Sequence, residues 1–201
     1  RKQLCIMPEG NHGHQHKLRP LVKGIFRIAF SSEEELKGLD HVSIVPVSID
    51  YNFFQHAGAD VVINYGKPIP VSDYMVRYRE NPANATNSIK NDLAERMSGM
   101  MHDIRSEGNY DLIYALTCYS TPVYLEICSK KGTCPVSKSK AETNFIARKK
   151  LGLLFDKTEK ENPELLEQLG NYVGRINDLT DYPFYTTELM EYRFNALKLV
   201  Y

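Results

Sequence analysis

The chain has 201 residues, enough for one sizeable hydrophobic core with a helical appendage. Its 25 basic and 25 acidic residues cancel, so no overall field draws it to nucleic acid or to an anionic membrane. No apolar run approaches the roughly 18 residues that a membrane span needs. Four cysteines, at positions 5, 118, 128 and 134, show no metal-type spacing, which favours reduced thiols in a cytosolic setting.

The first part of the chain predicts strands and a helix in alternation. Residues 4–7 form an apolar run of strand length that ends at Pro8, which cannot continue a central strand. Residues 20–31 carry apolar side chains at helical spacing. The β-branched run 42–49 and the alternating run 61–65 predict two more strands. We expect the three strands to share one sheet with the helix on one of its faces.

From about residue 85 onward the pattern predicts helices alone. An amphipathic helix is expected over residues 86–107, with Gly108 as its C-terminal stop. A short helix is expected over 110–119, and Thr121-Pro122 predicts the start of another that ends at residues 130–132. Further helices are expected over 138–156, from Pro163, and over 187–201, the first two as an antiparallel hairpin.

Polar residues crowd together directly after the first predicted strand. Glu9, Gly10, Asn11 and His12 follow one another there, and ligands of open α/β sheets bind at such strand ends. The basic residues that come next are suited to phosphate, because Arg grips it bidentately and Lys acts as a point charge. They are Lys17, Arg19 and Lys23. The alternative for each is an ordinary solvated surface charge.

Three histidines, His12, His14 and His16, alternate along this segment. In an extended chain alternate side chains point the same way, so three imidazoles could converge on zinc. Gly13 interrupts the segment, however, and no suitably spaced Asp or Cys offers a fourth ligand. We therefore predict no metal site and expect one of these histidines to be a polar group that binds substrate.

Several short blocks resemble those of the glycerophospholipid acyltransferases, which include glycerol-3-phosphate and lysophosphatidic-acid acyltransferases. The blocks are Pro8-Glu9-Gly10, Lys23-Gly24-Ile25-Phe26, Ile44-Val45-Pro46-Val47 and Asn64-Tyr65-Gly66-Lys67-Pro68-Ile69. They stand in the family's order and resemble its third and fourth blocks and its closing turn. The later helices resemble the tail of a glycerol-3-phosphate acyltransferase branch.

The resemblance implies acyl transfer from acyl-CoA or acyl carrier protein to glycerol 3-phosphate or a lysophospholipid, without a cofactor. It implies that Glu9 orients the acceptor's hydroxyls or the loop itself, and that Pro46 shapes the acyl-donor side. Gly10 would allow a close backbone approach, and the remaining residues of the acceptor site would be Asn11, His12, Lys17, Arg19 and Lys23. The common family pattern continues after Glu-Gly with Thr-Arg-Ser, and this chain departs from it with Asn11-His12-Gly13.

The family's catalytic His-x4-Asp dyad is absent from this sequence. The residues five positions after the six histidines are Lys17, Arg19, Leu21, Pro46, Val61 and Glu107. Only His102 has a carboxylate at that spacing, on a predicted helix far from the other blocks. Because the dyad precedes the Glu-Gly block in the family, we expect it upstream of Arg1, and we expect this polypeptide alone to be inactive. Loss of that segment would uncover an apolar face and favour self-association.

The sequence thus predicts an α/β fold, a sheet with packed helices like that of glycerol-3-phosphate acyltransferase, followed by an all-helical C-terminal part. We expect an acyltransferase portion over 1–84, covering helices over 85–135, and a hairpin with a terminal helix over 136–201. Attachment to the cytoplasmic side of the cell membrane is expected, either peripherally or through segments outside this chain, without nucleic acid as a partner. The alternatives are a non-catalytic module that binds a ligand or protein and, less favoured, a metal-dependent hydrolase.

Overall fold

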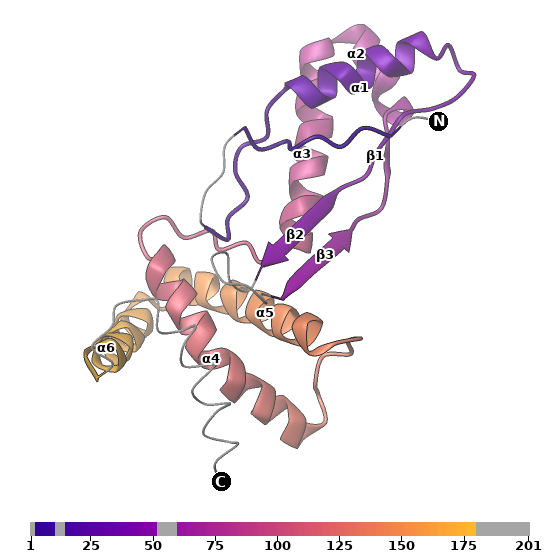
Figure 1. Ribbon diagram of the computed structural model, residues 1–201. Coiled ribbons are helices and arrows are strands. Elements are labelled where there is room, and N and C mark those ends of the chain that lie inside the picture. Colours follow the sequence, from indigo (N-terminus) through magenta and orange to yellow (C-terminus); the bar gives the residue numbers. More distant parts are fainter. Residues whose placement is uncertain (1–2, 11–14, 52–59, 180–201) are drawn as a thin grey trace. The chain divides into compact units, whose positions relative to one another are not determined.

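The computed structural model describes residues 3–10, 15–51 and 60–179, and the chain forms two compact units (Figure 1). Unit 1 comprises Arg1–Asp50 and Ile63–Met101, and unit 2 comprises Tyr51–Val62 and His102–Tyr201. The structure is mixed α and β, with about 60% helix and two small antiparallel sheets. This agrees with the expected combination of strands and helices followed by a helical part. The predicted three-part division stays a prediction.

Unit 1 contains a hairpin that is bent in the middle. Its strands are β1 (Ser43–Ile44), β2 (Val47–Tyr51), β3 (Val61–Tyr65) and β4 (Ile69–Pro70). β1 pairs with β4 and β2 pairs with β3, so Pro46 and Gly66 lie where the ladder is interrupted. The Gly66 N–H donates to the Pro46 carbonyl at 2.9 Å. A Cβ on Gly66 would stand 2.6 Å from the Met100 sulfur, so only glycine fits at this bend without a shift.

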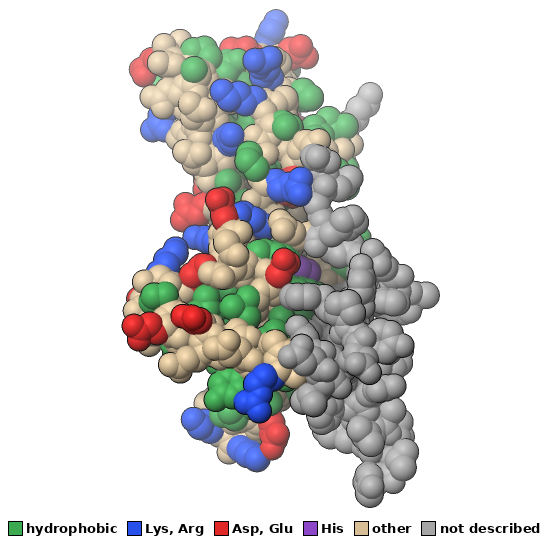
Figure 2. Space-filling view, turned by 90° about the vertical axis from the view of Figure 1, so that its left-hand side faces the viewer, with side chains coloured by type: hydrophobic (Ala, Val, Ile, Leu, Met, Phe, Trp, Pro, Cys, Tyr) green, Lys and Arg blue, Asp and Glu red, His purple; other side chains and the backbone are tan. Residues whose placement is uncertain are grey.

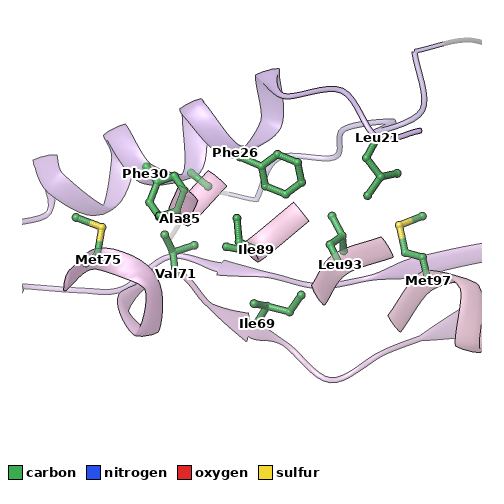
Figure 3. Close-up of a cluster of buried hydrophobic side chains, with 11 residues drawn as sticks. Leu21, Phe26, Phe30, Ile69, Val71, Met75, Ala85, Ile89, Leu93 and Met97 are labelled. Carbon is green, nitrogen blue, oxygen red and sulfur yellow. The ribbon is translucent and has the colours of Figure 1, made fainter. Parts of the chain in front are cut away.

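Three helices complete unit 1: α1 (Gly24–Glu35), α2 (Ser72–Glu80) and α3 (Pro82–Met100). α3 begins at Asn81, whose side-chain oxygen accepts the Asn84 N–H at 3.0 Å, and Pro82 occupies its first turn. Phe26 and Phe30 of α1 pack with apolar residues of α3 (Figure 3). Phe30 also stacks on Tyr78 of α2, with ring centroids 4.1 Å apart. The core of the unit is therefore formed by the apolar faces of its helices together with Ile69 and Val71.

Unit 2 is built from α4 (Tyr110–Lys131), α5 (Lys140–Glu161) and α6 (Pro163–Leu179). α4 packs chiefly on α5, and α6 contacts both. The buried Asp156 carboxylate of α5 accepts the backbone N–H groups of Arg105 and Ser106, at 2.9 and 3.2 Å. This pair of bonds holds the segment before α4 against α5. Among the described helices, none combines the length and the apolar character required to cross a bilayer.

The predicted strand over residues 4–7 is wrong. These residues form no strand, and both Leu4 and Met7 are exposed. A strand needs a partner for its ladder, and here a single antiparallel bridge joins Glu9 to Leu21. The prediction of one three-stranded sheet fails with it, although the runs 42–49 and 61–65 do contribute strands that pair as β2 and β3.

Several helix boundaries also differ from those predicted. α1 begins at Gly24 rather than at residue 20. α3 begins and ends earlier than expected, because Asn81-Pro82 provides its cap and the chain turns extended at Met101, well before Gly108. α2 was not predicted, since this short polar helix buries only Met75. α5 continues to Glu161, past the expected helix end at residue 156, whereas the helix start at Pro163 is confirmed.

The predicted break at Thr121-Pro122 is wrong, since Pro122 lies inside α4. Proline removes one backbone donor from a helix interior. Thr117 and Thr121 are buried, and their hydroxyls donate to the carbonyls of Ile113 and Thr117, both at 2.7 Å. Burial of this face on both sides of the proline keeps the two predicted pieces in one helix. The helix end at residues 130–132 is confirmed, and the predicted helix 187–201 lies outside the described residues.

The packing of α1 predicts a large loss of stability on truncation of Phe26. Phe26→Ala removes a fully buried ring from the unit 1 core and should lower the free energy of unfolding by about 3–5 kcal/mol. The control Val76→Ala removes an exposed side chain from α2 and should change it by about 0.5 kcal/mol or less. Urea unfolding followed by circular dichroism measures both. Equal effects of the two substitutions would contradict this packing.

Candidate functional site

The described residues 8–10 and 15–22 are joined by backbone contacts, and we call them the Glu9 loop. The Val22 N–H donates to the Pro8 carbonyl at 2.8 Å, and Glu9 bridges to Leu21. The Glu9 carboxylate then accepts the Arg19 backbone N–H at 2.9 Å. Glu9 is therefore engaged with the main chain of its own loop. Asn11 and His12, which were predicted as site residues, lie outside the described residues.

Gly10 lies at the tightest point of this closure. A Cβ built on Gly10 would stand 2.9 Å from a methyl carbon of Val22. The two sides of the loop thus approach closely at its base, and a side chain at position 10 would push them apart. The close backbone approach of Gly10 to a substrate stays a prediction; the neighbour that the structure shows is Val22.

A second contact ties the Glu9 loop to the hairpin. The His16 Nδ1 lies 3.8 Å from the Asp50 Oδ2 of β2, and these side chains are only 10% and 12% exposed. At this separation the two side chains are neighbours but are too far apart for a direct hydrogen bond. The loop is consequently held at two places, by Glu9 on Arg19 and by His16 beside Asp50.

Two of the three basic residues of the predicted site, Lys17 and Arg19, belong to the Glu9 loop, and Lys23 follows it. Lys17 and Arg19 are half-buried, and Lys23 is exposed directly before α1. Within the described parts of the chain, the Arg19 guanidinium forms no hydrogen bond or ion pair. A half-buried cation without a carboxylate partner is suited to an anionic ligand. The loop therefore offers positive charge on a backbone that its own contacts hold in place.

Pro46 lies in a different setting from the loop residues. Its side chain is fully buried and its carbonyl accepts the Gly66 N–H in the bent hairpin. The structure thus gives Pro46 a part in shaping the hairpin, whereas Glu9 contacts Arg19 and His16 lies beside Asp50 of β2.

Two histidine–carboxylate pairs are not found by looking for histidine and aspartate at the His-x4-Asp spacing. His16 meets Asp50, and the His41 Nδ1 lies 2.8 Å from the Glu33 Oε1 of α1. The other Glu33 oxygen accepts the Val42 N–H at 2.6 Å. Both pairs join residues of different elements, so only the folded chain reveals them. The one signal in the sequence is that Asp50 is a carboxylate ending an apolar strand.

The histidine at the expected dyad spacing has a structural setting. His102 was predicted on a helix, but it follows the end of α3 and its side chain is buried. A Cβ on Gly152 of α5 would stand 2.8 Å from the His102 ring. Glu107 is exposed. Close packing on Gly152 therefore explains the burial of His102.

No metal centre is assigned in the part of the chain that the structure describes. Across residues 3–10, 15–51 and 60–179, no three His, Cys, Asp or Glu side chains gather closely enough to hold an ion. His12 and His14 of the predicted triplet lie outside those ranges. The four cysteines are free thiols.

The geometry of the loop predicts that the Glu9 carboxylate controls its local opening. Glu9→Ala removes the acceptor of the Arg19 N–H, so this amide should lose protection worth about 1 kcal/mol. Glu9→Gln keeps an oxygen acceptor and should retain part of the protection. Hydrogen exchange of residues 15–22, read by mass spectrometry, measures the change, with the exposed α1 variant Glu34→Gln as control. Unchanged exchange in Glu9→Ala would show that this bond does not hold the loop.

The same sequence was compared with known proteins. Comparisons with protein-family models, with curated proteins and with solved structures find no match to this chain.

Proposed function

We propose that the chain is part of an O-acyltransferase whose Glu9 loop binds the acyl acceptor. The donor would be acyl-CoA or acyl carrier protein, and the acceptor glycerol 3-phosphate or its 1-acyl derivative. One observation carries the proposal: the carboxylate of Pro8-Glu9-Gly10 closes a loop on which Lys17 and Arg19 lie, with Lys23 directly after it. The activity belongs at the cytoplasmic side of the cell membrane, where a lipid acceptor is available.

The electrostatics of the loop suit a phosphate ester. A phosphate dianion needs charged donors, and the guanidinium of Arg19 can supply two parallel N–H groups. Lys17 and Lys23 add positive charge nearby on the same short segment. Because Glu9 and the His16–Asp50 contact hold the backbone before any ligand arrives, binding pays little ordering entropy.

In this proposal Glu9 positions the loop and takes no part in proton transfer. Its carboxylate already accepts a main-chain N–H, which supports the second of the two roles that the family resemblance implies. Substitution of Glu9 would then act through the placement of Arg19. Misplacement of a binding group by about 1 Å is enough to lower a rate about a hundredfold.

The chemical step needs a base in addition to this loop. The acceptor hydroxyl oxygen attacks the thioester carbonyl, its proton passes to a base, and the thiol leaves. The sequence has no His-x4-Asp, and we propose that the base lies outside these 201 residues. His16 beside Asp50 is an imidazole–carboxylate pair within the chain, and the proposal gives it a positioning role in the loop.

A second candidate function is a binding module without catalysis. It is favoured by the same absence of the dyad, since the loop offers cations for an anion and the sequence offers no base at the family's spacing. The two candidates differ in whether the parent protein transfers acyl groups at all.

Activity of the full-length protein tests the role of the loop. Glu9→Ala should lower kcat/KM for the acceptor at least about tenfold, which corresponds to about 1.4 kcal/mol of transition-state stabilisation. Arg19→Gln should act mainly on the KM of the phosphate-bearing acceptor, and the exposed α1 variant Arg27→Gln serves as the charge-matched control. Turnover at the wild-type rate in a folded Glu9→Ala protein would argue against any role for this carboxylate.

The isolated 201-residue polypeptide tests the proposed absence of a base. It should transfer no acyl group from labelled acyl-CoA to glycerol 3-phosphate, because nothing removes the proton of the attacking hydroxyl. Transfer at the rate of the full-length protein would place the base within the chain. His16→Ala and Asp50→Asn would then identify it.

A further inference from the structure

The loop of residues 132–139, which joins α4 to α5, is held firmly at both ends. At its start Gly132 has φ 65°, its N–H donates to the Ser129 carbonyl, and the Thr133 N–H donates to the Cys128 carbonyl at 2.9 Å. This is a Schellman closure of α4. At its end the Ser139 hydroxyl accepts the Glu142 N–H at 3.1 Å, and the Glu142 carboxylate accepts the Lys138 N–H at 2.6 Å. We call this segment the α4–α5 loop.

This ordered loop presents an apolar tip to solvent. Val136 is 98% exposed, and it follows Pro135 between the two capped helix ends. On α4, Val123 and Ile127 are 58% and 46% exposed and stand one helical turn apart, with Lys131 one turn further on. Val136 thus makes no packing contribution to unit 2 and is exposed on an ordered backbone.

The sequence around the tip is rich in lysine. From Ile127 to Lys140 the sequence contains four lysines and no Asp or Glu. Lys130 pairs with Glu126 at 2.6 Å, whereas Lys131, Lys138 and Lys140 are exposed and have no ion-pair partner within the described chain. Figure 2 shows Lys and Arg side chains beside hydrophobic ones, with acidic side-chain atoms also visible, at the lower end of the view. The zero net charge of the whole chain conceals this local excess.

We propose that the α4–α5 loop and the adjacent Val123–Ile127 face of α4 dock on an anionic lipid bilayer. Val136 enters the boundary between headgroups and acyl chains, and the three lysines lie at the level of the anionic headgroups. A lone exposed aliphatic residue gains free energy by leaving water for lipid, whereas a nucleic acid would use the lysines alone. This inference stands on the charge and exposure of unit 2 and does not rest on the proposed acyl transfer.

Vesicle co-sedimentation of the full 201-residue chain tests the proposal. Vesicles of phosphatidylcholine alone are compared with vesicles that also contain phosphatidylserine. The chain should bind the anionic vesicles, weakly or not at all the neutral ones, and less at high salt. Lys131→Gln/Lys138→Gln/Lys140→Gln should weaken binding roughly a hundredfold, about fivefold for each lysine. Val136→Asp should weaken it at least about tenfold.

The control removes the same charge elsewhere on unit 2. Lys150→Gln/Lys157→Gln/Lys160→Gln changes three exposed lysines of α5 that lie roughly 15 Å or more along the helix from Lys140, and it should bind nearly as the wild type does. Circular dichroism checks folding, and Val136→Ser, which cannot disturb a packed side chain, repeats the apolar test. Equal binding to both vesicle types, no binding, or equal loss in the α5 control would overturn the proposal. If the lysine variant loses binding while both Val136 variants bind as the wild type does, the surface is purely electrostatic and the proposal is overturned. Duplex DNA that displaces the chain from the vesicles would overturn it in the same way.

Discussion

The hydrogen bond from the Arg19 N–H to the Glu9 carboxylate is the contact on which the proposed site depends. Without it the Glu9 loop would be closed only at its base, by the Val22 to Pro8 bond and the Glu9–Leu21 bridge. With it, the Glu9 carboxylate fixes the backbone at Arg19, whose guanidinium has no hydrogen bond or ion pair within the described residues. A charged acceptor makes this bond stronger than a neutral one would. The backbone that carries these cations is therefore already ordered before a ligand binds.

In the hairpin of β2 and β3, polar side chains point inward and apolar side chains are exposed to solvent. Ser48 and Asn64 turn inward, where the Ser48 hydroxyl and the Asn64 amide donate to the Met100 carbonyl at the end of α3. The apolar residues of the same strands, Val47, Ile49 and Ile63 among them, are exposed. Inward polar groups are acceptable here because each finds a partner.

Regular apolar periodicity was the part of the fold that the sequence predicted well. Phe26, Ala29 and Phe30 of α1 and Ile89, Leu93 and Met97 of α3 are all buried, as their helical spacing indicated. The strand expected over residues 4–7 failed because a short apolar run does not reveal whether a partner strand exists. α2 was missed because one buried methionine gives no periodic signal.

The assignment of a binding site to the polar segment after Met7 stays a prediction. Within that segment the Glu9 carboxylate accepts the Arg19 N–H, and Gly10 lies close to Val22. The pairing of His16 with Asp50 joins a loop to a strand distant in sequence, and no local spacing encodes such a contact. Likewise, the composition suggested a chain without electrostatic preference, whereas folding leaves three lysines around one exposed valine at the end of α4.

Binding of glycerol 3-phosphate to the 201-residue chain tests the central claim most directly, because it needs neither an acyl donor nor a base. Titration calorimetry or amide chemical shifts of residues 15–23 would report it. The account predicts saturable binding that Arg19→Gln and Glu9→Ala both weaken, while the exposed control Arg27→Gln leaves it unchanged. Absence of saturable binding, or equal weakening by Arg27→Gln, would contradict the assignment of the Glu9 loop as the acceptor site.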